Sequence, residues 1–114
     1  MDERLEKALN YSNYMVTYNN QKLLLKEKFN ENLHYFVNGA QFIASVELIN
    51  YLNFLSNKDI KETIILDAND NPVKIENLSE FFENIQHIYF IALNQYYQEL
   101  SNLKLKRKVE KLVE

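Results

Sequence analysis

The chain has 114 residues and a net charge of −3, and 46% of its residues are hydrophobic. This length and composition predict a single folded domain over 1–114 and exclude wholesale disorder. The chain has no cysteine, which excludes disulfides and thiolate metal sites, and its acidic balance argues against nucleic-acid binding through the whole surface. No apolar run approaches the roughly 18 residues that span a bilayer, and the charged start Met1–Glu6 is unlike a secretory signal. We therefore expect a cytoplasmic protein without membrane contact.

Residues 2 to about 33 are predicted to form a helix, because apolar side chains recur there with helical spacing. One stripe contains Leu5, Leu9, Ser12, Val16 and Leu23. A second stripe contains Tyr11, Tyr14, Tyr18, Leu25 and Phe29. Asparagine is a poor helix former, so the sequence leaves open whether this helix continues through Tyr18–Gln21.

The pair Asn38-Gly39 predicts a β-hairpin, since both residues tolerate the positive φ angles of a type I′ turn. A two-residue loop at this position places apolar or aromatic residues opposite one another on one face of the hairpin. The predicted pairs are Val37 with Ala40, Tyr35 with Phe42, and Leu33 with Ala44. That face must be covered by another part of the molecule.

A short helix and a second hairpin follow. Ser45 is a suitable N-cap for a helix ending near Ser56-Asn57. The second turn lies at Asp67–Pro72, and a four-residue loop there predicts that Leu66 pairs with Val73 and Ile64 with Ile75.

The last predicted element is a helix capped by Asn77, which has the form of a capping box with Glu80. No helix-breaking residue follows it before Glu114. About 36 residues of helix are roughly 54 Å long, whereas a compact domain of this size is about 35 Å across. The helix must therefore break, project or run along a partner. Its apolar tail favours a homo-oligomer and contains Leu103, Leu105, Val109, Leu112 and Val113.

These elements predict an α+β fold: long helix, β-hairpin, short helix, β-hairpin, long C-terminal helix. In one arrangement the hairpins form a small sheet, and the long helices pack on it or on each other. The alternative is a helical hairpin with a strand-built tip, which is similar to the alpha-type subunit of prefoldin.

No residues form a recognised catalytic or ligand-binding pattern. His34 and His87 fit no metal-ligand spacing, and a chain with one glycine has no phosphate-binding loop. Asp67–Asn71 resembles the start of a calcium loop, but Pro72 and Leu78 stand where such a loop needs glycine and glutamate. We expect a non-enzymatic protein with no cofactor and no metal.

Two surfaces are candidate partner-binding sites. Tyr11, Tyr14 and Tyr18 form a stripe that suits either an interface or the packing of the two long helices. Basic residues near Leu103 recur at i, i+3, i+4 and i+7. They are Lys104, Arg107, Lys108 and Lys111. This basic stripe is either a solvated helix end that complements the helix dipole, or a docking strip for an acidic partner or for nucleic-acid phosphates.

Three stretches of the chain together resemble a known family. They are Leu9-Asn10-Tyr11-Ser12-Asn13-Tyr14, then Ile65-Leu66-Asp67 with Pro72-Val73-Lys74-Ile75-Glu76-Asn77-Leu78-Ser79-Glu80-Phe81, and finally Tyr96-Tyr97-Gln98-Glu99 with Lys108-Val109-Glu110-Lys111-Leu112. They resemble small proteins of large contractile-tailed bacteriophages of marine bacteria, a family that has no assigned activity. The resemblance implies a phage-encoded protein, acting in the host cytoplasm, with a role in head assembly or in engaging host machinery. Its expected partners are a second copy of itself, a phage structural protein or a host protein. An accessory protein that binds nucleic acid through the basic stripe is the alternative.

Overall fold

The structure is a computed structural model that describes residues 2–113 and, within them, the side chains of residues 2–108. Its elements follow the order α1 (Glu3–Asn32), β1 (His34–Val37), β2 (Ala40–Ile43), α2 (Val46–Asn57), β3 (Thr63–Leu66), β4 (Pro72–Ile75) and α3 (Leu78–Val113). The expected α+β order is confirmed.

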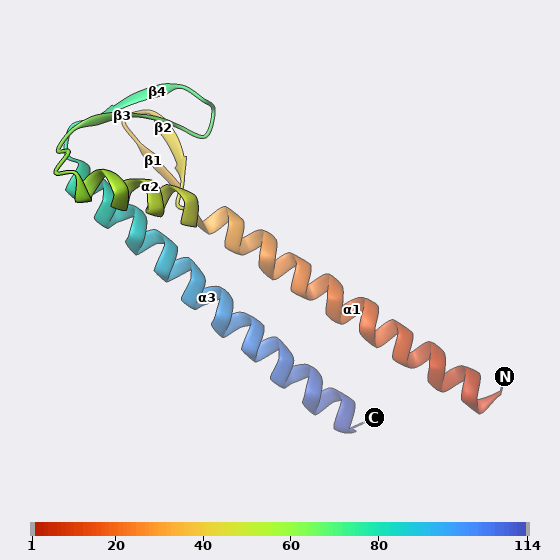
Figure 1. The fold of residues 1–114 in the computed structure, drawn as a ribbon. Coiled ribbons are helices and arrows are strands. Elements are labelled where there is room, and N and C mark those ends of the chain that lie inside the picture. The colour runs from red at the N-terminus through yellow and green to blue at the C-terminus, as the bar shows by residue number, and fades with distance from the viewer. Residues whose placement is uncertain (1, 114) are drawn as a thin grey trace.

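The molecule is an elongated helical hairpin with its strands gathered at one end. Figure 1 shows α1 and α3 projecting from a tip that contains both β-hairpins and α2. The chain measures 69 × 23 × 20 Å with a radius of gyration of 21.0 Å, whereas a compact chain of this length has about 13 Å. The last helix does not break, because α3 runs without interruption for 36 residues. It projects from the tip instead.

Helix α1 is also continuous, including the asparagine-rich segment Tyr18–Gln21. Its first turn is capped by Asp2, whose carboxylate accepts the backbone N–H of Arg4 at 3.1 Å. The low helix propensity of Asn19 and Asn20 is outweighed by packing against α3, because the neighbouring Gln21 accepts hydrogen bonds from Arg107 of α3. None of the residues in α1 is fully buried.

The first hairpin has the predicted register. Val37 pairs with Ala40 and Tyr35 with Phe42, and the backbone N–H of Ala44 donates to the carbonyl of Leu33 at 2.7 Å. The turn residues Asn38 and Gly39 have φ angles of 53° and 74°, as a type I′ turn requires. The face that carries Leu33, Ala40, Phe42 and Ala44 is buried in the tip.

The predicted register of the second hairpin is wrong by one residue, because Leu66 pairs with Pro72 and Ile65 with Val73. The loop contains three residues rather than four, and the N–H of Asp67 donates to the carbonyl of Asn71 at 2.9 Å. The carboxylate of Asp67 also accepts the N–H groups of Asn69 and Asn71, both at 2.9 Å. These bonds fix the tighter turn, and a one-residue shift moves every β3 side chain to the other face. Ile65 is consequently buried, while Ile64 and Leu66 point to solvent.

The hairpins form two separate two-stranded sheets rather than the expected single sheet. A backbone hydrogen bond joins them, from the N–H of Ala68 to the carbonyl of Gln41 at 2.7 Å. The inner faces of both sheets pack against helices α2 and α3, and together they form one core at the tip. Its largest fully buried side chains are Phe42, Leu52, Leu78 and Ile85.

The start of α3 is fixed to the tip in two ways. The predicted N-cap is confirmed, because the backbone N–H of Glu80 donates to the side-chain oxygen of Asn77 at 3.1 Å. The return bond differs from that of a capping box, since the side-chain amide of Asn77 donates to the Glu80 carboxylate at 3.3 Å. Phe81 then packs edge-on against Phe42, with ring centroids 4.9 Å apart. The direction of the long helix is therefore set where it leaves the strands.

Candidate functional site

The two arms are joined near the tip by an aromatic pair and an ion pair. The rings of Phe29 and Tyr96 stack with their centroids 5.0 Å apart, and the Lys26 ammonium lies 5.4 Å and 5.8 Å from them. The ammonium of Lys28 donates to a carboxylate oxygen of Glu99 at 2.7 Å. That hydrogen bond, followed by one from the Gln95 amide, lowers the pKa of Glu99 below its usual value of 4.5.

Farther along the arms, Arg107 of α3 contacts Gln21 and Tyr14 of α1. Its Nε donates to the side-chain oxygen of Gln21 at 2.9 Å, and its Nη2 donates to the same oxygen. Its guanidinium lies 5.6 Å from the ring of Tyr14, whose hydroxyl donates to the Arg107 carbonyl at 3.2 Å. Tyr14 in turn stacks in parallel with Tyr18 at 6.4 Å. We call the contact between α1 and α3, from Phe29 to Tyr14, the inner seam.

The candidate partner-binding residues divide between the inner seam and the surface. Tyr14, Tyr18 and Arg107 meet in the seam, and the half-buried Leu103 lines a groove of about 340 Å³ between the same helices. Tyr11, Lys104 and Lys108 are exposed. The side chain of Lys111 lies outside the described residues. The assignment of these residues to a partner stays a prediction.

The apolar tail of α3 is only partly described. Leu103 faces the groove between the arms and Leu105 is 64% exposed. The side chains of Val109, Leu112 and Val113 lie outside the described residues, so self-association through this tail also stays a prediction.

A second apolar stripe follows the side of α1 that faces away from α3. We call Leu5, Leu9, Ser12, Val16 and Leu23 the outer stripe. Its four apolar side chains are between 46% and 58% exposed. At 3.6 residues per turn, these positions lie on the opposite side of the helix from Tyr14, Tyr18 and Leu25. Helix α3 cannot cover both sides, so the outer stripe is left in solvent.

Sequence reasoning identified the outer stripe but did not predict that it would be exposed. The available signal was the presence of two apolar stripes on opposite sides of one helix, since the described residues contain one other long helix, α3, which can cover one side.

The tip also exposes large apolar side chains. Phe36 on the outer face of the first hairpin is 70% exposed, and Ile64 on the second hairpin is 63% exposed. Leu66 joins them because the tighter turn reverses the predicted facing of β3. On α3, Phe90 and Tyr97 are exposed in the same way. Apolar surface is therefore distributed over the tip and over both arms.

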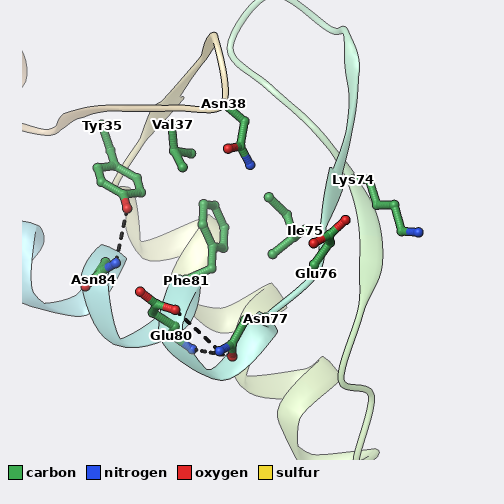
Figure 2. A pocket seen from close by; sticks show the side chains of 10 residues that line it. All are labelled: Tyr35, Val37, Asn38, Lys74, Ile75, Glu76, Asn77, Glu80, Phe81 and Asn84. Atoms are coloured by element: carbon green, nitrogen blue, oxygen red, sulfur yellow. Dashed lines mark hydrogen bonds between the residues drawn. The ribbon is translucent and has the colours of Figure 1, made fainter.

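An open groove of about 390 Å³ lies between the first hairpin, β4 and the start of α3. Figure 2 shows the Tyr35 hydroxyl accepting a hydrogen bond from the Asn84 amide, at 3.1 Å, and the capping pair Asn77 and Glu80 at the other end. Among the described residues, no buried side-chain nitrogen or oxygen lacks a partner. The polar contacts of the groove thus cap α3 and brace the first hairpin against it.

Titratable side chains do not cluster into a metal site in the described part of the chain, where no group of three or more suitable ligands is found. His34 and His87 are exposed on different elements, and the ring of His34 contacts the Gln41 amide at 3.2 Å. Asp67 accepts backbone N–H groups in its own turn, chiefly that of Asn71, and these bonds lower its pKa. Within residues 2–113, no helix has the length and hydropathy to cross a bilayer.

No protein family, curated protein or solved structure matches the chain. The arms, the tip and their exposed apolar side chains are thus the observations from which a function can be argued.

Proposed function

We propose that this protein is a non-enzymatic protein–protein interaction protein that assembles with further copies of itself. The observation that carries the proposal is the outer stripe, an apolar surface on a projecting arm that no element within residues 2–113 covers. Monomeric proteins rarely expose long contiguous apolar surface, and patches of this kind mark interaction sites.

The energetic argument concerns the four apolar side chains of the outer stripe. Full burial of one such side chain stabilises by roughly 1.5–3 kcal/mol. Each is about half exposed, so covering all four supplies several kcal/mol before the entropic cost of association. A contact of this size supports a modest dimer, and the apolar side chains at the tip extend the surface that an assembly can use.

The resemblance to phage proteins gives this proposal a setting. A phage-encoded protein of this shape would act in head assembly or by engaging host machinery, with a phage structural protein or a host protein as an additional partner. The projecting arms support such a role, because they present a long surface at a distance from the folded tip (Figure 1).

Light scattering of the full chain after size exclusion, from about 1 to 100 μM, tests the proposal. We expect the mass to rise above 13.7 kDa with concentration. Leu9→Gln with Val16→Gln should lower that mass, while Asn10→Gln with Thr17→Ser, on other sides of α1, should not. A protein that stays monomeric over the whole range would contradict self-assembly.

Nucleic-acid binding through the basic stripe is the alternative function. Its four cations include Arg107, whose guanidinium is engaged with Gln21 and Tyr14 in the seam. Lys104 and Lys108 remain exposed. Binding through phosphates weakens steeply as salt rises from about 50 to 200 mM, so binding of a labelled duplex that is insensitive to salt would exclude this mode.

A further inference from the structure

The outer stripe has the spacing of a two-stranded coiled coil. Three apolar residues are spaced seven positions apart along α1. A second set of three residues has the same seven-residue spacing and lies between them on the same side of the helix. The first set, called a positions, is Leu9, Val16 and Leu23, and the second set, called d positions, is Leu5, Ser12 and Asn19. All six are exposed. The stripe ends at Lys26, whose ammonium turns toward the rings of Phe29 and Tyr96 in the seam.

A second copy of α1 is the occupant that fits this stripe. The a and d positions of one helix are complementary to those of an identical helix, and a two-fold dimer brings the same surface of both copies together. Figure 1 shows α1 flanked by α3 alone along most of its length, so the side opposite α3 is open to a second helix.

The charges beside the stripe determine the orientation of the two copies. One edge of the stripe carries Lys22 at a g position, and the other carries Glu6 and Glu27 at e positions. In a parallel pair, a g residue faces the e residue five positions later in the partner helix. Lys22 would then meet the partner's Glu27, and the symmetry repeats this ion pair. In an antiparallel pair the acidic edge would face the same acidic edge.

The side chains involved are available for these contacts. Lys22 and Glu27 are exposed, and neither forms an ion pair within the described part of the chain. The ammonium of Lys22 lies 5.3 Å from the ring of Tyr18, on the flank of the helix. The ammonium therefore leans toward the inner seam in the single chain, and the flexible lysine stem must swing toward the stripe to reach the partner helix.

The polar d positions add a reason for exact register in a parallel pair. In that arrangement Asn19 faces the partner's Asn19, and Ser12 faces the partner's Ser12. A polar residue at a single core position specifies register and oligomeric state at some cost in stability, because sliding would leave it unpaired. With the helices in register, each buried amide has an amide opposite it.

From the exposed heptad stripe and its charged edges, we propose that two copies of this chain pair through α1, parallel and in register, over residues 5–27. The inference rests on the proposed self-assembly through the outer stripe and adds the register and orientation of the two copies. Both tips then lie at the same end of the dimer, and the order of helices across it is α3, α1, α1 and α3.

Single cysteines test the orientation, because the natural chain has none. In a parallel pair, d residues face their own copies at a separation that a disulfide can bridge. We expect Ser12→Cys and Asn19→Cys, prepared separately, each to give disulfide-linked dimers on mild oxidation. Thr17→Cys, exposed on another side of α1, measures the background from random collisions and should stay largely monomeric.

The pattern of cross-links distinguishes the possible outcomes. An antiparallel pair places at most one of the two positions against its own copy, so a cross-link at only one of them overturns the parallel proposal. If light scattering gives a mass above that of the monomer but neither cysteine variant cross-links, the copies associate through another surface. That result would overturn the parallel α1 pair and would still support the proposed self-assembly. A monomeric wild type overturns both.

Charge reversal tests the predicted ion pair independently. Lys22→Glu and Glu27→Lys should each weaken self-association about fivefold, because each converts two attractive contacts into two repulsive ones. An equimolar mixture should form a heterodimer at least as tightly as the wild type forms its homodimer, since both contacts become attractive again. Circular dichroism of each variant shows whether it is folded. Folded variants that do not associate preferentially when mixed would overturn the proposal.

Discussion

Replacement of Gly39 by valine tests the turn on which the first hairpin depends. Gly39 has a φ of +74°, and a Cβ added there meets no atom within 4 Å. The cost is therefore backbone strain rather than a clash, and a β-branched residue in this conformation costs about 1–3 kcal/mol. For a chain of 114 residues the entropy of unfolding is roughly 0.24 kcal/mol/K, so the expected loss in Tm is about 4–12 °C.

Thermal unfolding followed by circular dichroism measures this loss directly. Gly39→Asn is the matched control, because asparagine tolerates the left-handed region and should lower Tm by much less than valine. The order wild type, Asn variant, Val variant is the specific result expected for strain. A valine variant that melts within about one degree of the wild type would refute the type I′ turn and the register based on it.

Three other predictions concern the tip and the inner seam. Phe81→Ala should destabilise the fold by about 3–5 kcal/mol in urea unfolding, because Phe81 is 4% exposed in the core, whereas Phe90→Ala at an exposed site of α3 should cost far less. Asp67→Ala should lower Tm at pH 7, because it removes the acceptor that closes the second turn. The difference from the wild type should shrink in acid, since the pKa of Asp67 is lowered in the fold and its contribution is lost as the pH falls through that pKa. Glu99→Gln should lower Tm at pH 7, because it removes the ion pair with Lys28. This difference in Tm from the wild type should also close as the pH falls below 4.5 and Glu99 becomes protonated. A difference in Tm that persists unchanged at pH 3 would contradict the assigned contact.

The parts of the fold that sequence predicted correctly depend on local chemistry. Asn38-Gly39 permits one turn type, and that turn fixes the pairing of its neighbours. The same holds for the N-cap at Asn77, whose side chain accepts the backbone N–H of Glu80 one helical turn later.

The parts that sequence did not predict depend on side-chain contacts that composition does not reveal. The second hairpin differs from the prediction because the carboxylate of Asp67 binds two backbone N–H groups, and because Asp70 adopts a φ of 61°. A four-residue loop and a three-residue loop are both compatible with the residues present, but they bury opposite faces of β3. The separation of the hairpins into two sheets is likewise a property of the packed tip.

Candidate partner residues were harder to predict, because a tyrosine stripe suits both a seam within the chain and an interface between chains. Tyr14 and Tyr18 lie in the seam. The exposure of Leu9 and Val16 depends on which side of α1 receives α3, and periodicity alone does not determine that choice.

The hairpin shape also determines the order in which the arms can join during folding. Across the inner seam, the contact between Lys28 and Glu99 links residues 71 positions apart, while that between Tyr14 and Arg107 links residues 93 apart. Closing such loops in an unfolded chain is entropically costly, but the contacts of the tip join residues closer in sequence, such as Tyr35 and Asn84, which are 49 positions apart, and they bring the bases of both arms together. The seam should then close from the tip outward and open in the reverse order. Amide hydrogens should accordingly exchange faster with increasing distance from the tip along α1.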